Sequence, residues 1–256
     1  METLLLIVVN KFYIILFLVL FLSKDNINIE VGSCHSAYNK SQPMIAKWND
    51  EYWLLLMQLY LRKPMGTKPI YSRDMVDLAL ELHLPPKYLY GKMLQLRRLD
   101  TPRIEHLWNT YANHPKKLSK GVLLLRRMQG FNNATSFYEG VEVSESFETE
   151  FKPLPDCGQL TPMMLVIILD QYFRLTPNTM VEETAEIKSL AQMMDIPPSL
   201  IVEVMNIYQA LDPCLRRTTM PDTPLATHCK QVWKRYGNDD PIKLAAYAAQ
   251  LHEYFR

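Results

Sequence analysis

Residues 85–99 carry the side chains of this chain best suited to binding a polyanion. Pro85-Pro86 would open a helix here that runs to Leu99. If this helix turns Leu89, Met93 and Leu96 towards the core, polar residues recur at helical spacing on the opposite face. That face holds Lys87, Gly91, Gln95 and Arg98, flanked by Tyr88 and Lys92. Lys and Arg pair with phosphates, whereas Gln and Arg can also bind base edges. The pattern therefore favours contact with DNA.

A second basic cluster, Lys116, Lys117, Lys120, Arg126 and Arg127, would extend this track of phosphate contacts. An acidic stretch that follows it could instead shield it: Glu139, Glu142, Glu145, Glu148 and Glu150. The predicted nucleic-acid-binding residues are Lys87, Tyr88, Lys92, Gln95, Arg97, Arg98, Lys116, Lys117 and Lys120. The competing interpretation is that these residues form ordinary solvated helix faces.

No catalytic or metal-binding motif accompanies these residues. The six histidines include no HExxH spacing, and the chain has no GxGxxG, Walker or GxSxG sequence. The four cysteines are widely separated and lack the paired spacing of a zinc site. His228 and Cys229 are adjacent, so their side chains would diverge on a helix. We therefore expect a protein that is not an enzyme and has no metal or cofactor.

The segment that carries the basic helix occurs twice in the chain. Residues 52–100 align with residues 164–212 without a gap, at a shift of 112, and 10 of the 49 positions are identical. Apolar positions coincide as well, for example Leu56 with Ile168 and Met75 with Ile187. Two segments that bury the same positions share a core, so we predict an internal duplication.

Each copy is expected to be helical, and only 8 of 256 residues are Gly. Ser72 is a candidate helix cap, and Pro85-Pro86 opens the next helix. Two helices joined by so tight a turn are typical of a helix-turn-helix. The predicted fold is all-α, with two tandem copies of a helix-turn-helix-like five-helix unit. A longer loop around residues 217–227 would interrupt the second copy.

The charges divide the chain into a basic and an acidic half. Residues 44–130 carry 15 Lys and Arg against 7 Asp and Glu, whereas residues 131–256 carry 10 against 17. The basic half can bind a polyanion, or the halves can pair with each other. The predicted divisions are residues 1–43 as an apolar segment and linker, 44–130 as the basic repeat, 131–160 as an acidic linker and 161–256 as the acidic repeat.

The N-terminal segment has three interpretations. From Leu4 to Leu22 it is apolar except for Asn10 and Lys11, and it is long enough to span a bilayer. It could be an export signal or membrane anchor, although a lysine within the span is costly. It could also reflect a misplaced start, since Met44 stands just before the first repeat.

Several short motifs resemble a known module. Leu56–Leu61, Pro64-Met65-Gly66, Met75–Ala79, Leu84-Pro85-Pro86 and Leu107-Trp108 occur in this order. They resemble the helical module that precedes the nuclease domain in many bacterial HNH-type restriction endonucleases. That resemblance covers about residues 48–115, and more weakly residues 161–236, and implies a role in DNA recognition. The paired histidines and CxxC pairs of the nuclease itself are absent from this sequence.

The sequence thus predicts a non-enzymatic DNA-binding or regulatory protein that acts through the basic face of repeat 1, with repeat 2 offering a surface for a protein partner. One alternative is a protein-binding helical scaffold, tethered to a membrane if residues 4–22 are an anchor. Another is a subunit that brings DNA to a separately encoded nuclease. The expected location is the cytoplasm, or the membrane or cell exterior if residues 4–22 act as a signal.

Overall fold

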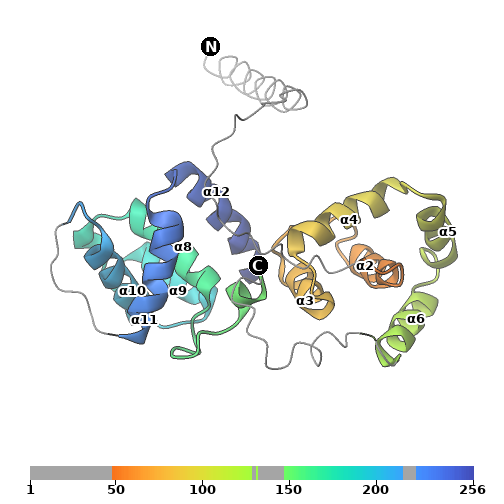
Figure 1. The fold of residues 1–256 in the computed structure, drawn as a ribbon, viewed down its shortest axis with the longest axis horizontal. Helices are drawn as coiled ribbons and strands as arrows, with labels where there is room; N and C mark the ends of the chain where they lie inside the picture. The colour runs from red at the N-terminus through yellow and green to blue at the C-terminus, as the bar shows by residue number, and fades with distance from the viewer. Residues whose placement is uncertain (1–47, 129–130, 132–146, 216–222) are drawn as a thin grey trace, which may run out of the picture. The chain divides into compact units, whose positions relative to one another are not determined.

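The computed structural model describes residues 48–128, 131, 147–215 and 223–256 (Figure 1). Within these ranges the chain forms α-helices and short helical turns, and its β-structure is a single isolated bridge between Leu154 and Cys157. The all-α prediction is confirmed. None of the described helices is long and apolar enough to cross a membrane. The predicted segment Leu4–Leu22 and the alternative start at Met44 lie outside the described residues.

The first half of the described chain contains five helices. They are α2 (Tyr52–Leu61), α3 (Arg73–Leu82), α4 (Pro86–Arg98), α5 (Pro102–Tyr111) and α6 (Pro115–Arg127). The apolar helix α2 packs against α3, α4 and α6 and supplies the centre of the core. Three of the helices, α4, α5 and α6, begin with proline, whose missing N–H is no loss in a first turn.

The second half begins before residue 161. The short helix η2 (Phe147–Phe151) places Phe151 in the core of this half, together with Leu154 and Leu160. The remaining elements are α8 (Pro162–Arg174), η3 (Pro177–Thr179), α9 (Ala185–Met194), α10 (Pro198–Leu211), α11 (Pro224–Val232), η4 (Trp233–Gly237), α12 (Pro241–Leu251) and η5 (His252–Phe255). Part of the predicted acidic linker is therefore core structure, whereas residues 132–146 lie outside the description.

The second and third helices of the two halves keep the 112-residue spacing. Helices α3 and α9 start at residues 73 and 185, and α4 and α10 start at 86 and 198. In both halves the intervening turn starts with a left-handed residue, His83 with φ 54° and Asp195 with φ 56°. The N–H of Leu84 donates to Ala79 O over 3.0 Å, and that of Ile196 to Ala191 O over 3.1 Å. The same helix-ending motif thus occurs at equivalent positions.

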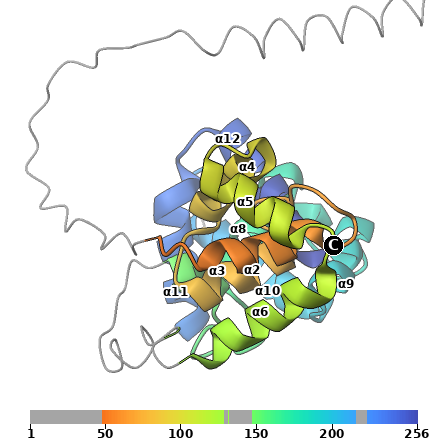
Figure 2. The same cartoon turned by 90° about the vertical axis from the view of Figure 1, so that its right-hand side faces the viewer.

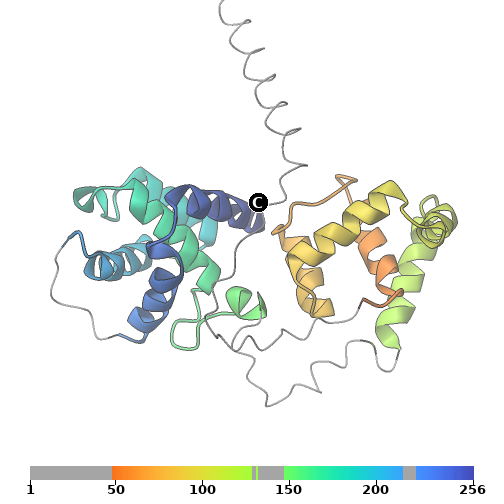
Figure 3. The ribbon, with the colours of Figure 1, turned by 45° about the horizontal axis from the view of Figure 1, so that its top comes forward.

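The fourth helices of the two halves pack differently. Helix α11 packs against α8 and α10, whereas α5 packs mainly against α6 and buries only Ile104 (Figures 1 and 3). The connections explain the difference: residues 99–101 join α4 to α5, but residues 212–223 join α10 to α11. The longer connection lets α11 lie back against α10. The third helix is therefore covered in the second half and not in the first.

Candidate nucleic-acid interface

Helix α4 exposes the face on which sequence analysis placed the contacts. Its opposite side is fixed in the core by Leu89, Met93 and Leu96, each at most 1 % exposed. The predicted residues Lys87, Gln95, Arg97 and Arg98 are all exposed. Periodicity alone thus gave the correct orientation of this helix.

Gly91 lies in the middle of the exposed face. A Cβ atom built on this residue would meet no other atom within 4 Å. The position is therefore open to solvent, and the backbone of α4 is bare between Lys87 and Gln95. A glycine here costs some helix stability, but it allows the backbone to approach another molecule closely.

The cations of this face have no carboxylate partner among the described residues. The ion pairs that involve the first half are Arg62–Asp74, Arg103–Asp50, Arg126–Glu81 and His83–Glu148. Lys87, Arg97 and Arg98 take part in none of them. Arg97 and Arg98 lie in the last turn of α4, where positive charge also complements the helix dipole. Their charge is nevertheless available to an external anion.

Tyr88 forms an aromatic cluster with Trp48 and Trp53, and Lys92 lies against this cluster. The Lys92 ammonium lies 5.1 Å from the ring centroid of Trp48 and 5.6 Å from those of Trp53 and Tyr88. Such cation–π contacts fix the side chain on its own fold. Lys92 is only partly exposed, so it contributes charge to the edge of the face rather than a freely extended arm.

Sequence analysis did not predict this cluster. The i, i+4 spacing of Tyr88 and Lys92 places them on one side of α4 and could have suggested their contact. Trp48 precedes α2 and meets Trp53 with ring centroids 4.8 Å apart. Its position depends on how the chain enters the first helix, and no local pattern encodes that.

The second predicted cluster lies on a different helix. Lys116, Lys117 and Lys120 are exposed on α6, and α2 lies between α6 and α4, packed against both (Figure 2). The Lys117 ammonium lies 5.2 Å from the ring centroid of Tyr111. These lysines form a separate basic surface.

The two glutamates of the acidic stretch that the structure describes, Glu148 and Glu150, bind residues outside α6. Glu150 accepts hydrogen bonds from Arg235 at 3.0 Å and from Tyr247 at 3.1 Å, both in the second half. Glu148 lies 2.8 Å from Nδ1 of His83, in the turn between α3 and α4. Glu139, Glu142 and Glu145 lie outside the described residues. In these contacts, Glu148 and Glu150 do not meet the basic cluster on α6 that they were expected to shield.

Helix α10 has no comparable face. Glu203 takes the place of Gly91, and the fully buried Ile207 takes the place of Gln95. Gln209, at the position of Arg97, is 2 % exposed, and its side-chain N–H group donates to Met180 Sδ over 3.0 Å. The apolar side of α10 is thus covered within its own half, largely by α8 and α11.

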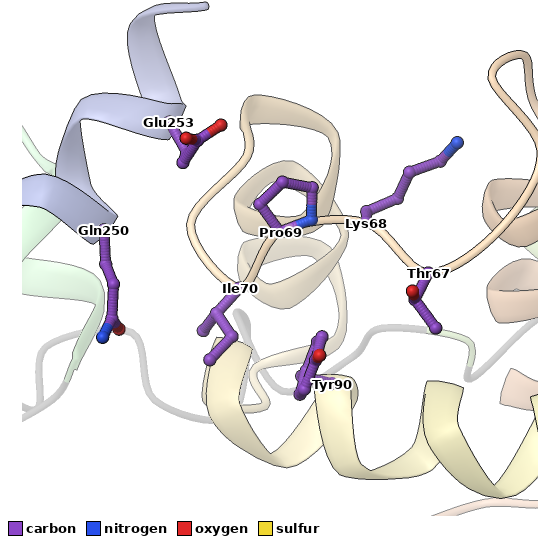
Figure 4. Close-up of a pocket in the computed structure, with 7 residues that line it drawn as sticks. All are labelled: Thr67, Lys68, Pro69, Ile70, Tyr90, Gln250 and Glu253. Carbon is purple, nitrogen blue, oxygen red and sulfur yellow. The ribbon is translucent and has the colours of Figure 1, made fainter. Parts of the chain in front are cut away.

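A pocket of about 370 Å³ lies beside α4, on another flank from the basic face. Thr67, Lys68, Pro69, Ile70, Tyr90, Gln250 and Glu253 line it. Lys68 extends away from Gln250 and Glu253 (Figure 4). Its ammonium donates to Arg62 O over 2.7 Å. Desolvation lowers the pKa of Lys68 below its ordinary value. The lining includes neither a histidine nor a cysteine, and the described residues contain no group of metal-ligating side chains.

Comparison of the whole chain with protein-family models, with curated proteins and with solved structures gives no significant match. Assignment of the site therefore rests on its own geometry.

Proposed function

We propose that this protein binds double-stranded DNA without catalysing a reaction on it, and that the exposed face of α4 enters a groove of the duplex. Lys87 and Arg97 contact phosphates, whereas Gln95 and Arg98 lie where they can reach base edges. The observation that carries this proposal is a basic helix face with no carboxylate partner among the described residues.

The arrangement around α4 supports this assignment. Helices α3 and α4 are joined by residues 83–85, and α2 packs against both of them. This order of helices is compatible with a helix-turn-helix, whose second helix, here α4, reads the major groove. Gly91 supports it further, because a bare stretch of backbone can lie close to the groove floor.

Under this proposal, an internal duplication explains why only the first half exposes a basic face on its third helix. Under this proposal both halves descend from one five-helix unit, and the common spacing of α3, α4, α9 and α10 is its remnant. In the second copy, the longer connection allowed α11 to cover α10. At the positions of Lys87, Gln95 and Arg98 it carries the uncharged residues Ser199, Ile207 and Ala210. The second copy then serves to support the first or to bind a protein partner.

Titration of a short labelled duplex with the wild-type protein tests the proposal. With the two phosphates contacted by Lys87 and Arg97 neutralised, a plot of log K against log salt should have a slope of about −2. A single-stranded oligonucleotide of the same length should bind more weakly, because it lacks a major groove. No binding to the duplex at about 50 mM salt, where phosphate contacts are strong, would contradict the proposal and favour a protein-binding scaffold.

A further inference from the structure

The outer face of α6 combines positive charge with exposed apolar side chains. Leu118, Val122 and Leu125 are buried on the inner face of the helix, which packs against α2. On the outside, Leu123 is 49 % and Leu124 55 % exposed, and the following Met128 is 56 % exposed. The cations that surround them are Lys116, Lys117, Lys120 and Arg127, all exposed. Residues 115–128 contain no acidic residue.

The composition of this face limits what can cover it. Phosphate groups of a nucleic acid would satisfy the lysines but would leave Leu123 and Leu124 without an apolar partner. A second copy that presented the same face would bring two sets of cations together, at a cost in repulsion. The occupant must therefore be anionic and apolar at the same time.

We propose that α6 docks on an anionic phospholipid bilayer. Leu123, Leu124 and Met128 enter the boundary between headgroups and acyl chains, while the lysines extend to lipid phosphates. Leu124 and Met128, four residues apart, form a short apolar strip beside Lys117 and Lys120, whereas Leu123 lies on the far side of Lys120. Apolar residues bordered by Lys and Arg in this way are typical of a helix that lies in a membrane interface. The proposal does not depend on DNA binding, since α4 and α6 lie on different sides of α2 (Figure 2).

The N-terminal sequence adds an independent reason to favour a bilayer over an acidic protein helix. The apolar run from Leu4 to Leu22 has the length of a membrane span. Residues 23–47 connect it to the first described residue, and a fully extended chain of that length reaches at most about 90 Å. A protein held by that run would keep α6 within reach of the membrane surface.

Co-sedimentation of the full chain with vesicles tests the proposal. Neutral phosphatidylcholine vesicles are compared with vesicles in which phosphatidylserine replaces part of the lipid. Each basic residue near an anionic surface contributes roughly fivefold to the affinity, so the four cations should favour the anionic vesicles by at least about tenfold. Comparing the two partition coefficients as a ratio cancels any binding through Leu4–Leu22 that is independent of lipid charge.

The variant Leu123→Gln/Leu124→Gln should lower binding to the anionic vesicles by about tenfold. The matched control is Ile242→Gln on α12, a residue that is 78 % exposed, and it should leave binding unchanged. Equal binding of the wild type to both kinds of vesicle would overturn the proposal, as would a double variant that binds like the wild type. Loss of duplex binding in the double variant would instead assign α6 to the nucleic-acid interface and would also overturn it.

Discussion

Exchange of both Lys87 and Arg98 for Glu is expected to weaken duplex binding by at least about 100-fold. The two side chains lie at opposite ends of the exposed face of α4, and each substitution replaces a cation by an anion. A lost contact to a phosphate or a base costs about 1–3 kcal/mol, and repulsion by the phosphates adds to this loss. Fluorescence anisotropy with a labelled duplex measures the change directly.

A matched variant shows whether the affinity depends on where the charges lie or only on the net charge of the protein. Lys188→Glu/Lys230→Glu produces the same change in net charge with two exposed residues of the second half. It should change the affinity by less than about threefold, because distant charges are screened at physiological salt. Equal losses in the two double variants would mean that binding follows net charge alone. The thermal unfolding of the Lys87→Glu/Arg98→Glu variant should stay close to that of the wild type, because neither residue has a carboxylate partner among the described residues.

The second large effect concerns stability, and it follows from the unequal packing of the two halves. Trp233→Ala is expected to lower the free energy of unfolding by about 3–5 kcal/mol. The ring is 8 % exposed and lies against Tyr172, Phe173 and Tyr208, with centroids at most 6.0 Å away. A Cβ atom on Gly237 would lie 2.7 Å from the same ring, so the packing there is tight.

Trp108→Ala in the first half is the natural comparison. Trp108 is only partly buried and meets Tyr60 with ring centroids 5.8 Å apart. Its loss should cost about 2 kcal/mol, because less apolar surface leaves water there on folding. Chemical denaturation of both variants gives the two free energies. A cost for Trp108 that equals or exceeds that for Trp233 would contradict the difference in packing between the fourth helices.

The sequence allowed most of the helices to be predicted. The third helix was expected from Pro85-Pro86 to Leu99 and extends from Pro86 to Arg98. At the shift of 112 residues its counterpart falls on residues 197–211, and α10 extends over Pro198–Leu211. Proline at the first turn and an apolar stripe are local signals, so they indicate where the helix begins and which face is buried without reference to the rest of the chain.

One local prediction was wrong in its detail. Ser72 occupies the N-cap position of α3, but its hydroxyl donates to Pro69 O over 3.0 Å and accepts no hydrogen bond from the helix. The loop before α3 turns back on itself and offers the hydroxyl this nearer acceptor. Capping propensity describes an average, and the local chain path decides the individual case.

Long-range features could not be predicted from these local patterns. The cation–π contacts of Lys92 depend on Trp48, which is 44 residues away in sequence. The cover over α10 depends on where α11 packs, and the length of the connection between α10 and α11 does not specify that position. The separation of the α6 lysines from the α4 face likewise depends on the packing of α2 between the two helices.

Site-specific photocrosslinking tests the central claim most directly. A benzophenone amino acid at position 91 would stand in open space at the centre of the α4 face. The same amino acid at position 203, which is 112 residues further on, would be exposed at the equivalent place on α10. We predict that the protein labelled at position 91 crosslinks to a bound duplex and that the protein labelled at position 203 does not. A bound duplex that crosslinks at position 203, or at neither position, would contradict the assignment of α4 as the DNA-binding helix.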